Sequence, residues 1–328
     1  MINLKTNYLG LQLKNPIIVS SSGLTSTVEK IKQLEKAGAG AVVLKSLFEE
    51  QIKMEAGLLL NSSGNTDYPE ASDYINSYVQ SNSLADYLTL IEEAKNAVEI
   101  PVIASINCYS GDEWTDFAKK IEAAGADALE LNIYYLPTDK DFTSHDYERI
   151  YFDLSVKMKN LLHIPFAVKL GAHFTNLTNI ADQLYYRGAT GVVLFNRFYS
   201  PDIDIKNNKF KSSEVFSSPS DIRNTLRWVA IVSAQIEGLD ISASTGVHSG
   251  EAVIKLLLAG AKTVQVCSVL YKKGADYIST MIEDLKKWME HNNYSTIDEF
   301  RGTMSYKNIP DPSVYERAQF MKYFSELQ

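Results

Sequence analysis

The stretch Lys36-Ala-Gly-Ala-Gly-Ala-Val-Val-Leu-Lys45 starts at the end of an amphipathic segment and closes as a short apolar run. The same pattern returns at residues 123–132, 186–195 and 258–267. In each copy a glycine supplies the left-handed turn that ends a helix, and the small residue after it lets the chain pass into a buried parallel strand. The sequence therefore predicts four helix-to-strand corners of one kind.

Four further strands are expected where a short apolar run follows a turn signal. Ile-Pro pairs open the runs at residues 100–106 and 164–170, because proline stops a helix and favours an extended chain. Residues 15–20 and 239–244 complete the set. Amphipathic stretches lie between the strands, at residues 28–37, 112–124, 176–187 and 251–259. Eight strands that alternate with helices predict an α/β protein with a single (β/α)8 (TIM) barrel, and an open doubly wound sheet is the alternative.

The predicted barrel covers about residues 15–290 of a single domain that spans residues 1–328. Two connections are much longer than the others, at about residues 47–82 and 197–218. Long loops after barrel strands form lids or binding loops on the C-terminal face, where barrel enzymes place their sites. Residues 291–328 form a polar, aromatic-rich extension that we expect to pack on the surface or to contact another subunit.

The composition favours a globular protein that binds a small molecule. Of the 328 residues, 45% are hydrophobic and 22% are charged, which is sufficient for a full core. The formal net charge of −8 argues against nucleic acids and anionic membranes as partners. No signal peptide or membrane-spanning run is seen, so we expect a cytoplasmic protein. Cys108 and Cys267 lie far apart, so neither a disulfide framework nor a metal site is expected.

A ring of polar side chains is predicted at the C-terminal ends of the strands. It contains two lysines and three asparagines, namely Lys45, Lys169, Asn107, Asn132 and Asn196. A buried lysine needs an anion or a strong acceptor, because an unpaired buried charge is costly. For any single residue, a partner within the protein is an equally good interpretation. The coincidence across six strands indicates an electron-rich ligand above the ring.

The last two strand ends carry a separate signal for phosphate. Thr245-Gly246 and Ser268 follow these strands, and backbone N–H groups at such turns form the phosphate site of many barrels. A ligand that carries a phosphate is therefore expected. The sequence has neither a Gly-x-Gly-x-x-Gly motif nor a P-loop, which argues against a Rossmann dinucleotide site or a nucleoside triphosphate site.

Taken in order, these stretches resemble the dihydroorotate dehydrogenase family over about residues 4–300. The matching segments are Asn15-Pro leading to Ser21-Ser22-Gly23, Lys45-Ser46, Glu130-Leu-Asn-Ile133, Val168-Lys-Leu170, Thr245-Gly246-Val247 and Gln265-Val-Cys-Ser-Val-Leu270. No single motif is diagnostic, but their order and barrel positions are. The resemblance implies a soluble FMN-dependent oxidoreductase that converts dihydroorotate to orotate in pyrimidine biosynthesis.

The resemblance also implies roles for the polar ring. The Ser-Gly turn and the Lys-Ser pair would contact the flavin, and Lys169 would stabilise negative charge on the reduced ring. The N–H groups around Gly246 and Ser268 would hold the phosphate. The FMN-binding set expected on this basis is Ser21, Ser22, Gly23, Lys45, Ser46, Asn107, Asn132, Lys169, Asn196, Thr245, Gly246, Cys267 and Ser268.

The chain departs from the family where the catalytic base is expected. Family members continue the Glu-Leu-Asn segment with Ser-Cys-Pro-Asn or Ser-Ser-Pro-Asn, whereas this chain reads Asn132-Ile-Tyr-Tyr-Leu-Pro-Thr138. Tyr135 takes the base position, although a phenol with an ordinary pKa of roughly 10 is a poor base at neutral pH. Thr138 replaces the closing asparagine, and Asn76 lies in the nearest remnant of the substrate loop. Cys267 replaces a glycine of the phosphate turn. FMN binding is therefore better supported than dihydroorotate chemistry.

The leading hypothesis is an FMN oxidoreductase that acts on a CH–CH bond, with Tyr135 as acid/base and Asn76, Thr138 and Arg197 near the substrate. A second hypothesis keeps the flavin but reads another small molecule through Tyr134, Tyr135, Arg197 and Tyr199. A flavin-free, phosphate-binding lyase or isomerase and a non-catalytic flavin-binding protein are further alternatives. A homodimer is expected by resemblance, while the electron acceptor and any redox partner stay open.

Overall fold

The computed structural model describes residues 2–48, 69–107, 113–133, 135–212 and 214–317. Its centre is a barrel in which each strand pairs in parallel with the next and the last strand pairs with the first. The eight strands are β3 (Ile17–Val19), β4 (Ala41–Val43), β6 (Val102–Asn107), β7 (Ala128–Asn132), β8 (Phe166–Leu170), β9 (Gly191–Leu194), β12 (Asp240–Ser244) and β13 (Thr263–Val266). The predicted (β/α)8 barrel is confirmed, since an open sheet would leave two unpaired edges.

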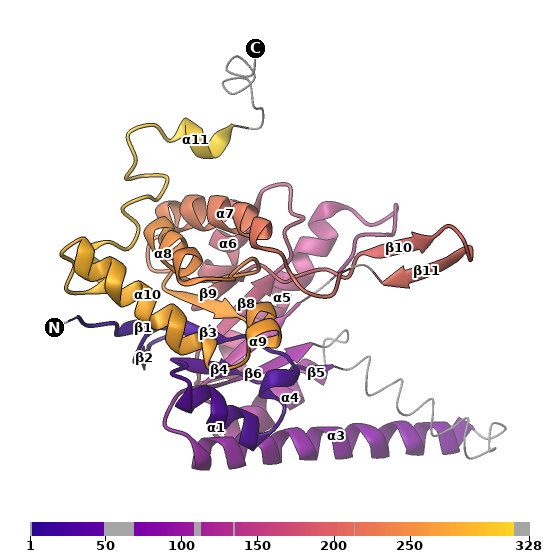
Figure 1. Ribbon diagram of the computed structural model, residues 1–328. Coiled ribbons are helices and arrows are strands. Elements are labelled where there is room, and N and C mark those ends of the chain that lie inside the picture. The colour runs from indigo at the N-terminus through magenta and orange to yellow at the C-terminus, as the bar shows by residue number, and fades with distance from the viewer. Residues whose placement is uncertain (1, 49–68, 108–112, 134, 213, 318–328) are drawn as a thin grey trace.

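Helices connect the strands and cover the outside of the barrel (Figure 1). They are α1 (Val28–Lys36), α3 (Pro69–Ala97), α4 (Glu113–Ala123), α5 (Ser144–Leu161), α6 (Leu177–Tyr186), α7 (Ile222–Gln235) and α8 (Gly250–Ala259). Their buried residues pack against the outer faces of the strands in one continuous hydrophobic cluster. The four helices expected from helical spacing are all present, within one or two residues of the predicted bounds.

The repeated corners fold as the sequence predicts. Gly38, Gly125, Gly188 and Gly260 have φ values of 105°, 92°, 101° and 116°, a region that residues with a Cβ rarely adopt. The alanine after each glycine is buried, and the chain then enters the next strand. The glycine-alanine pair therefore joins helix to strand in the way the repeat indicated.

A feature that the sequence did not predict closes the N-terminal end of the barrel. Strands β1 (Thr6–Tyr8) and β2 (Leu11–Leu13) form an antiparallel hairpin. Its Tyr8, Leu9 and Leu13 join the small inner cluster of side chains inside the barrel. In Figure 1 this hairpin lies beside the N-terminus, at the opposite end of the barrel from strands β10 (Pro201–Asp204) and β11 (Lys209–Ser212). The inside of the barrel is therefore accessible from the C-terminal face alone.

The two long connections follow β4 and β9. In the first, residues 49–68 lie outside the described residues, β5 (Leu47–Phe48) extends the sheet beside β6, and residues 69–82 already belong to the long helix α3. In the second, β10 and β11 form an antiparallel hairpin that reaches away from the barrel (Figure 1). That connection ends in the short helix η2 (Pro219–Asp221), which leads directly into α7.

The C-terminal part packs against the barrel of its own chain. After β13 come α9 (Ser268–Lys273), α10 (Tyr277–His291), η3 (Ile297–Glu299) and α11 (Ser313–Glu316). Gly302 and Met304 donate backbone hydrogen bonds to carbonyls of α8, and Tyr306 donates to a carbonyl of α7. Within the described residues, no helix has both the length and the apolar character needed to cross a membrane.

Candidate active site

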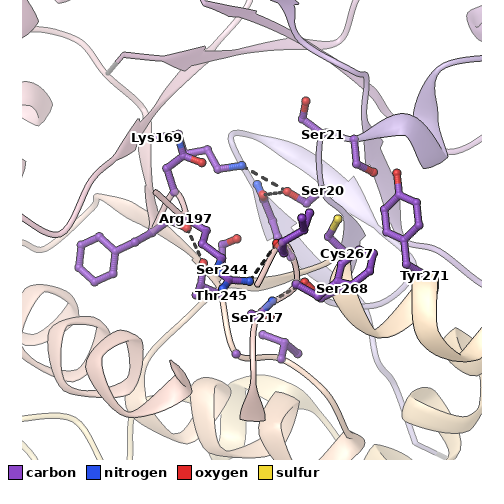
Figure 2. A pocket seen from close by; sticks show the side chains of 18 residues that line it. Ser20, Ser21, Lys169, Arg197, Ser217, Ser244, Thr245, Cys267, Ser268 and Tyr271 are labelled. Carbon is purple, nitrogen blue, oxygen red and sulfur yellow. Dashed lines mark hydrogen bonds between the residues drawn. The ribbon is translucent and has the colours of Figure 1, made fainter. Parts of the chain in front are cut away.

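A cavity of about 470 Å³ opens at the C-terminal ends of the strands. Its wall is built by the residues that follow β3, β9, β12 and β13, by Lys169 on β8 and by the segment from Val215 to Ser217. Figure 2 shows Lys169 pointing toward Ser20, with Thr245, Ser217 and Ser268 grouped below them. The cavity therefore lies where barrel enzymes carry their sites.

The floor of this cavity is a buried hydrogen-bonded network. Lys169 Nζ lies 3.3 Å from Glu130 Oε1 and 3.2 Å from Ser20 Oγ. Gln265 Nε2 donates to the other oxygen of Glu130 at 2.7 Å, and Ser20 Oγ donates to Gln265 Oε1 at 2.9 Å. The carboxylate of Glu130 is thus one anionic partner of Lys169. The ammonium group still carries positive charge to the cavity wall, since Lys169 lines it.

The opposite end of the cavity is suited to an anion. Gly246, Val247 and Ser268 line it, and their backbone N–H groups donate no hydrogen bond within the described part of the chain. Gly246 has a φ of 82°, and a Cβ there would lie 2.1 Å from the backbone nitrogen of Ile222. Free N–H groups that converge on a cavity are the usual protein ligands of a phosphate. Glycine is required here because the chain runs too close to η2 and α7 for a side chain.

The connection from β9 to α7 folds over this anion end. Arg197 donates from Nη1 to the carbonyl of Val215 at 2.9 Å and from Nη2 to the carbonyl of Glu214 at 2.7 Å. Ser217 N donates to Ser268 Oγ at 3.1 Å. Arg197 therefore fixes the loop that covers the cavity, and its guanidinium hydrogen-bonds the loop's own backbone.

A histidine sits behind the loop. His248 Nε2 is 2.9 Å from Ser217 Oγ, and Lys272 Nζ is 3.3 Å from the carbonyl of the same serine. Partial burial and the nearby Lys272 lower the pKa of His248 below its ordinary value. At neutral pH the imidazole is therefore uncharged and accepts or donates a single hydrogen bond to Ser217.

Serines connect the cavity to the second and third barrel strands. Ser21 Oγ is 3.0 Å from Ser46 Oγ, which in turn is 2.7 Å from Ser105 Oγ. The backbone of Ser105 exchanges hydrogen bonds with the hydroxyl of Tyr87 on α3, at 2.9 and 2.8 Å. Burial raises the pKa of Tyr87 well above its ordinary value, so this phenol stays protonated. The chain of hydroxyls thus fixes the turn after β3, which forms one wall of the cavity.

Comparison with known proteins agrees with this geometry. The sequence model of the family described as "Dihydroorotate dehydrogenase" matches residues 3–289. The chain belongs to the dihydroorotate dehydrogenase family. It is thus an oxidoreductase, as the resemblance in the sequence implied.

Curated relatives match over nearly their whole length. The protein named "Dihydroorotate dehydrogenase B (NAD(+)), catalytic subunit" from Methanocaldococcus jannaschii is 27% identical over 311 residues, which cover 91% of this chain and 97% of the relative. The protein of the same name from Thermoplasma volcanium is 26% identical over 315 residues, covering 92% and 98%. That from Alkaliphilus metalliredigens is 27% identical over 315 residues, covering 92% and 99%.

Most residues that the family resemblance assigned to FMN lie in the wall of the larger cavity. They are Ser21, Ser22, Lys169, Asn196, Thr245, Gly246, Cys267 and Ser268, together with the substrate candidate Arg197. Ser46 joins this wall through Ser21, and Asn132 accepts a hydrogen bond from Asn196 at 3.0 Å. The structure thus gathers on one cavity residues from five strand ends.

Other expected cofactor residues lie at its edge. Gly23 approaches Tyr271, whose Oη would be 2.9 Å from a Cβ at that glycine. Asn107 ends β6 beside Phe48, and Lys45 is exposed. Burial raises the pKa of the Cys267 thiol, so Cys267 contributes a neutral side chain to the wall.

Apart from Arg197, the described residues predicted to contact substrate do not line the larger cavity. Tyr135 lines a second, smaller cavity beside the first, and Tyr151 and Phe198 line the same cavity. Thr138 is exposed and lines neither cavity. Asn76 belongs to α3, but its side chain lies outside what is described, as does all of Tyr134.

Sequence reasoning did not single out several residues of the larger cavity as site residues. Ser20 and Gln265 form its floor, and Phe216, Ser217 and Tyr271 cover its anion end. The length of the connection after β9 was the available signal for Phe216 and Ser217. Tyr271 reaches the site because α9 starts immediately after β13, which no local pattern reveals.

Proposed function

We propose that the chain binds FMN in the larger cavity and uses it to oxidise a CH–CH bond of a small ring acid, with dihydroorotate as the first candidate. The observation that carries this proposal is that one cavity combines a group of backbone N–H donors with a buried lysine. One end offers three unpaired backbone N–H groups, of Gly246, Val247 and Ser268, and the other offers the ammonium group of Lys169. A phosphate ester with an electron-rich ring meets both requirements.

The residues present fit FMN at each end. The amides around Gly246 would hold the phosphate dianion, because a left-handed glycine presents consecutive N–H groups to it. Lys169, kept in place by Glu130 and Ser20, would face the pyrimidine part of the ring and favour the negative charge of the reduced state. When bound, FMN supplies the acceptor for the hydride of the substrate.

Dihydroorotate is favoured by the names of the relatives and by the amides at the cavity edge. All three relatives described above carry dihydroorotate dehydrogenase in their names and match over more than nine-tenths of this chain. Asn132 and Asn196 are hydrogen-bonded to each other, which orients both amides toward the same region. Paired amides recognise the alternating N–H and C=O groups of a dihydropyrimidine.

Tyr135 is our candidate for the group that takes the substrate proton, because it occupies the position of the family base. Its ring lines the smaller cavity, so this role requires Tyr135 to move toward the larger cavity when substrate binds. Such loop closure is common in enzymes and would exclude water from the flavin.

A second subunit is the natural route for the electrons. The relatives are named catalytic subunits and carry NAD(+) in their names. We therefore propose that this chain passes electrons from its flavin to a partner subunit that reduces NAD⁺, and that the catalytic chain itself is a homodimer. Co-purification of a tagged chain, followed by its mass in solution, tests both statements.

The absorption spectrum of the purified protein tests the function directly. Bands of oxidised flavin that bleach anaerobically on addition of dihydroorotate are the expected result. Flavin bands that persist would remove dihydroorotate as the substrate and retain the cofactor. A colourless protein that does not take up added FMN would contradict the proposal as a whole.

A further inference from the structure

A second cavity, of about 170 Å³, lies beside the first on the C-terminal face. It is formed by the segment after β7, the first turns of α5, the segment after β8 and Phe198 after β9. The segments that follow β8 and β9 contribute to both cavities through different residues. Lys169, Asn196 and Arg197 line the larger cavity, and Gly171 and Phe198 line the smaller one. The smaller cavity is therefore a distinct site.

The wall of this cavity is mostly aromatic, with six rings drawn from four segments. They belong to Tyr135, Phe142, Tyr147, Tyr151, Phe174 and Phe198. Buried Tyr151 is central, since its ring meets Tyr135 edge-on at 6.4 Å and Phe174 edge-on at 5.4 Å between centroids. Edge-on contacts of this kind stabilise the arrangement of the rings that line the cavity.

The absence of a side chain at Gly171 leaves room for the ring of Phe198. A Cβ at Gly171 would lie 2.5 Å from Cζ of Phe198, so the ring packs directly onto the glycine backbone. On its other side the ring contacts His173, with centroids 4.7 Å apart. The aromatic wall is thus built in advance and does not depend on a ligand to assemble it.

The charge that faces the cavity is negative. Asp139 and Glu148 line it, whereas no lysine or arginine of the described residues does so. Within the described ranges, the side chain of Glu148, on helix α5, makes no hydrogen bond or ion pair. Two cations that neighbour these residues in the sequence form ion pairs, Lys140 with Asp141 at 2.9 Å and Arg149 with Asp153 at 3.4 Å.

The helix α5 begins at this cavity, and its N-terminus by itself would favour an anion. A carboxylate of the chain itself already satisfies this preference for an anion. The carboxylate of Asp146 accepts hydrogen bonds from the backbone and the hydroxyl of Thr143, at 2.8 and 2.6 Å, and so places a negative charge in the first turn. The carboxylates of Asp139 and Glu148 therefore determine the sign of the ligand.

We propose that this second cavity binds a small organic cation, namely an ammonium group that carries a compact apolar body. Aromatic faces attract a cation through their quadrupoles and desolvate it at little cost, and the two carboxylates add direct Coulomb attraction. The cavity volume admits a group of the size of trimethylammonium and excludes a nucleotide. Tyr135 belongs both to this wall and to the flavin chemistry proposed above, but binding of the cation itself requires no flavin.

Titration calorimetry of the full chain with choline, at neutral pH, tests the proposal. The matched probe is 3,3-dimethylbutan-1-ol, which has the same shape and no charge. We expect saturable choline binding, and at least roughly tenfold weaker binding of the neutral alcohol, because both cation–π and carboxylate attraction are lost. Equal binding of the two probes, or no choline binding at millimolar concentration, would overturn the proposal.

Two substitutions then locate the site. Glu148→Gln and Asp139→Asn should each weaken choline about threefold, and the double variant about tenfold, while binding of the neutral alcohol stays as in the parent chain. Glu290→Gln, at an exposed position of α10, is the matched control and should leave the choline affinity unchanged. A double variant that binds choline as tightly as the parent would contradict the proposed site. Because binding is read by heat, the result does not depend on whether dihydroorotate is oxidised.

Discussion

Lys169 and Glu130 face each other inside the barrel, with Nζ 3.3 Å from Oε1 and side chains that are 7% and 2% exposed. They lie on the adjacent strands β8 and β7, where the parallel register pairs Lys169 with Asn132. Glu130 is two residues before Asn132 and therefore points to the same side of the sheet. The floor of the larger cavity contains a buried ion pair that the alternation of strand side chains brings together.

Removal of one partner of this pair should destabilise the fold. Lys169→Met leaves the Glu130 carboxylate buried with Gln265 alone, and we expect the free energy of unfolding to fall by about 3–5 kcal/mol. Urea denaturation measures this value. The double variant Lys169→Met/Glu130→Gln should recover a large part of the loss, and equal instability of the single and double variants would show that the charge is not its cause.

Gly246 should be intolerant of a side chain where a comparable glycine is not. Gly246→Ala brings a Cβ to 2.1 Å from the Ile222 nitrogen, so the phosphate turn has to shift, and FMN affinity should fall about 100-fold. Gly125→Ala is the matched control, because its φ of 92° is similarly strained but a Cβ there meets nothing within 4 Å. It should cost about 1 kcal/mol of stability and leave FMN affinity unchanged. Flavin fluorescence titration compares the two.

Arg197 should control how long the cofactor stays bound. Arg197→Lys replaces the two hydrogen bonds to Glu214 and Val215 by one at most, and the covering loop should open more often. We expect FMN release to accelerate about tenfold and amide hydrogen exchange of residues 214–217 to increase. Arg223→Lys, on the exposed face of α7, should change neither rate. Slower release in Arg197→Lys would be inconsistent with a loop-holding role.

Stability should depend on pH through His248. Burial and Lys272 lower its pKa in the folded state, so the unfolded chain binds the proton more tightly than the folded chain does. The stabilisation is present above the ordinary histidine pKa of about 6.5 and is lost as the pH falls from there through the lowered value. Urea unfolding at several pH values from 7 down to 4.5 should show this slope. His248→Asn should reduce it, and a variant with the parent slope would refute the assignment.

Tyr135→Phe separates cofactor binding from proton transfer. Tyr135 does not line the larger cavity, where we propose that FMN binds, so FMN affinity should be unchanged. Removal of the hydroxyl should slow anaerobic flavin reduction by dihydroorotate about 100-fold, a usual contribution of a positioned base. Tyr147→Phe, in the same smaller cavity, is the control and should reduce flavin at the parent rate. Full activity of Tyr135→Phe would assign the proton to another group.

The local sequence was sufficient for the barrel because its signals act over a few residues. A glycine with positive φ ends a helix wherever it stands, and an apolar run after Gly38, Gly125, Gly188 or Gly260 can only be buried as a strand. Four of the eight strands follow from that repetition, and the other four from apolar runs that follow a turn signal. The hairpin of β1 and β2 was missed because three-residue strands carry too little pattern.

The same reasoning located the candidate cofactor residues but not the position of the candidate catalytic residue. Lys169 lies near the end of β8, and Asn196, Gly246 and Ser268 come two residues after β9, β12 and β13, so these strands determine their place on the C-terminal face. Tyr135 lies on a loop, and a count from Asn132 gives its position in the chain but not the direction of its ring.

What only the tertiary structure decided is which side chains meet. Closure of the barrel places Gln265 of β13 and Glu130 of β7 within hydrogen-bond distance across the interior, although 135 residues separate them. The ring of Phe198 likewise packs on the backbone of Gly171, and both residues line the smaller cavity. The sequence by itself determined the strands and the residues at their ends, because those depend on neighbours along the chain. The partners of each residue depend on contacts through space, which exist only once the barrel has closed.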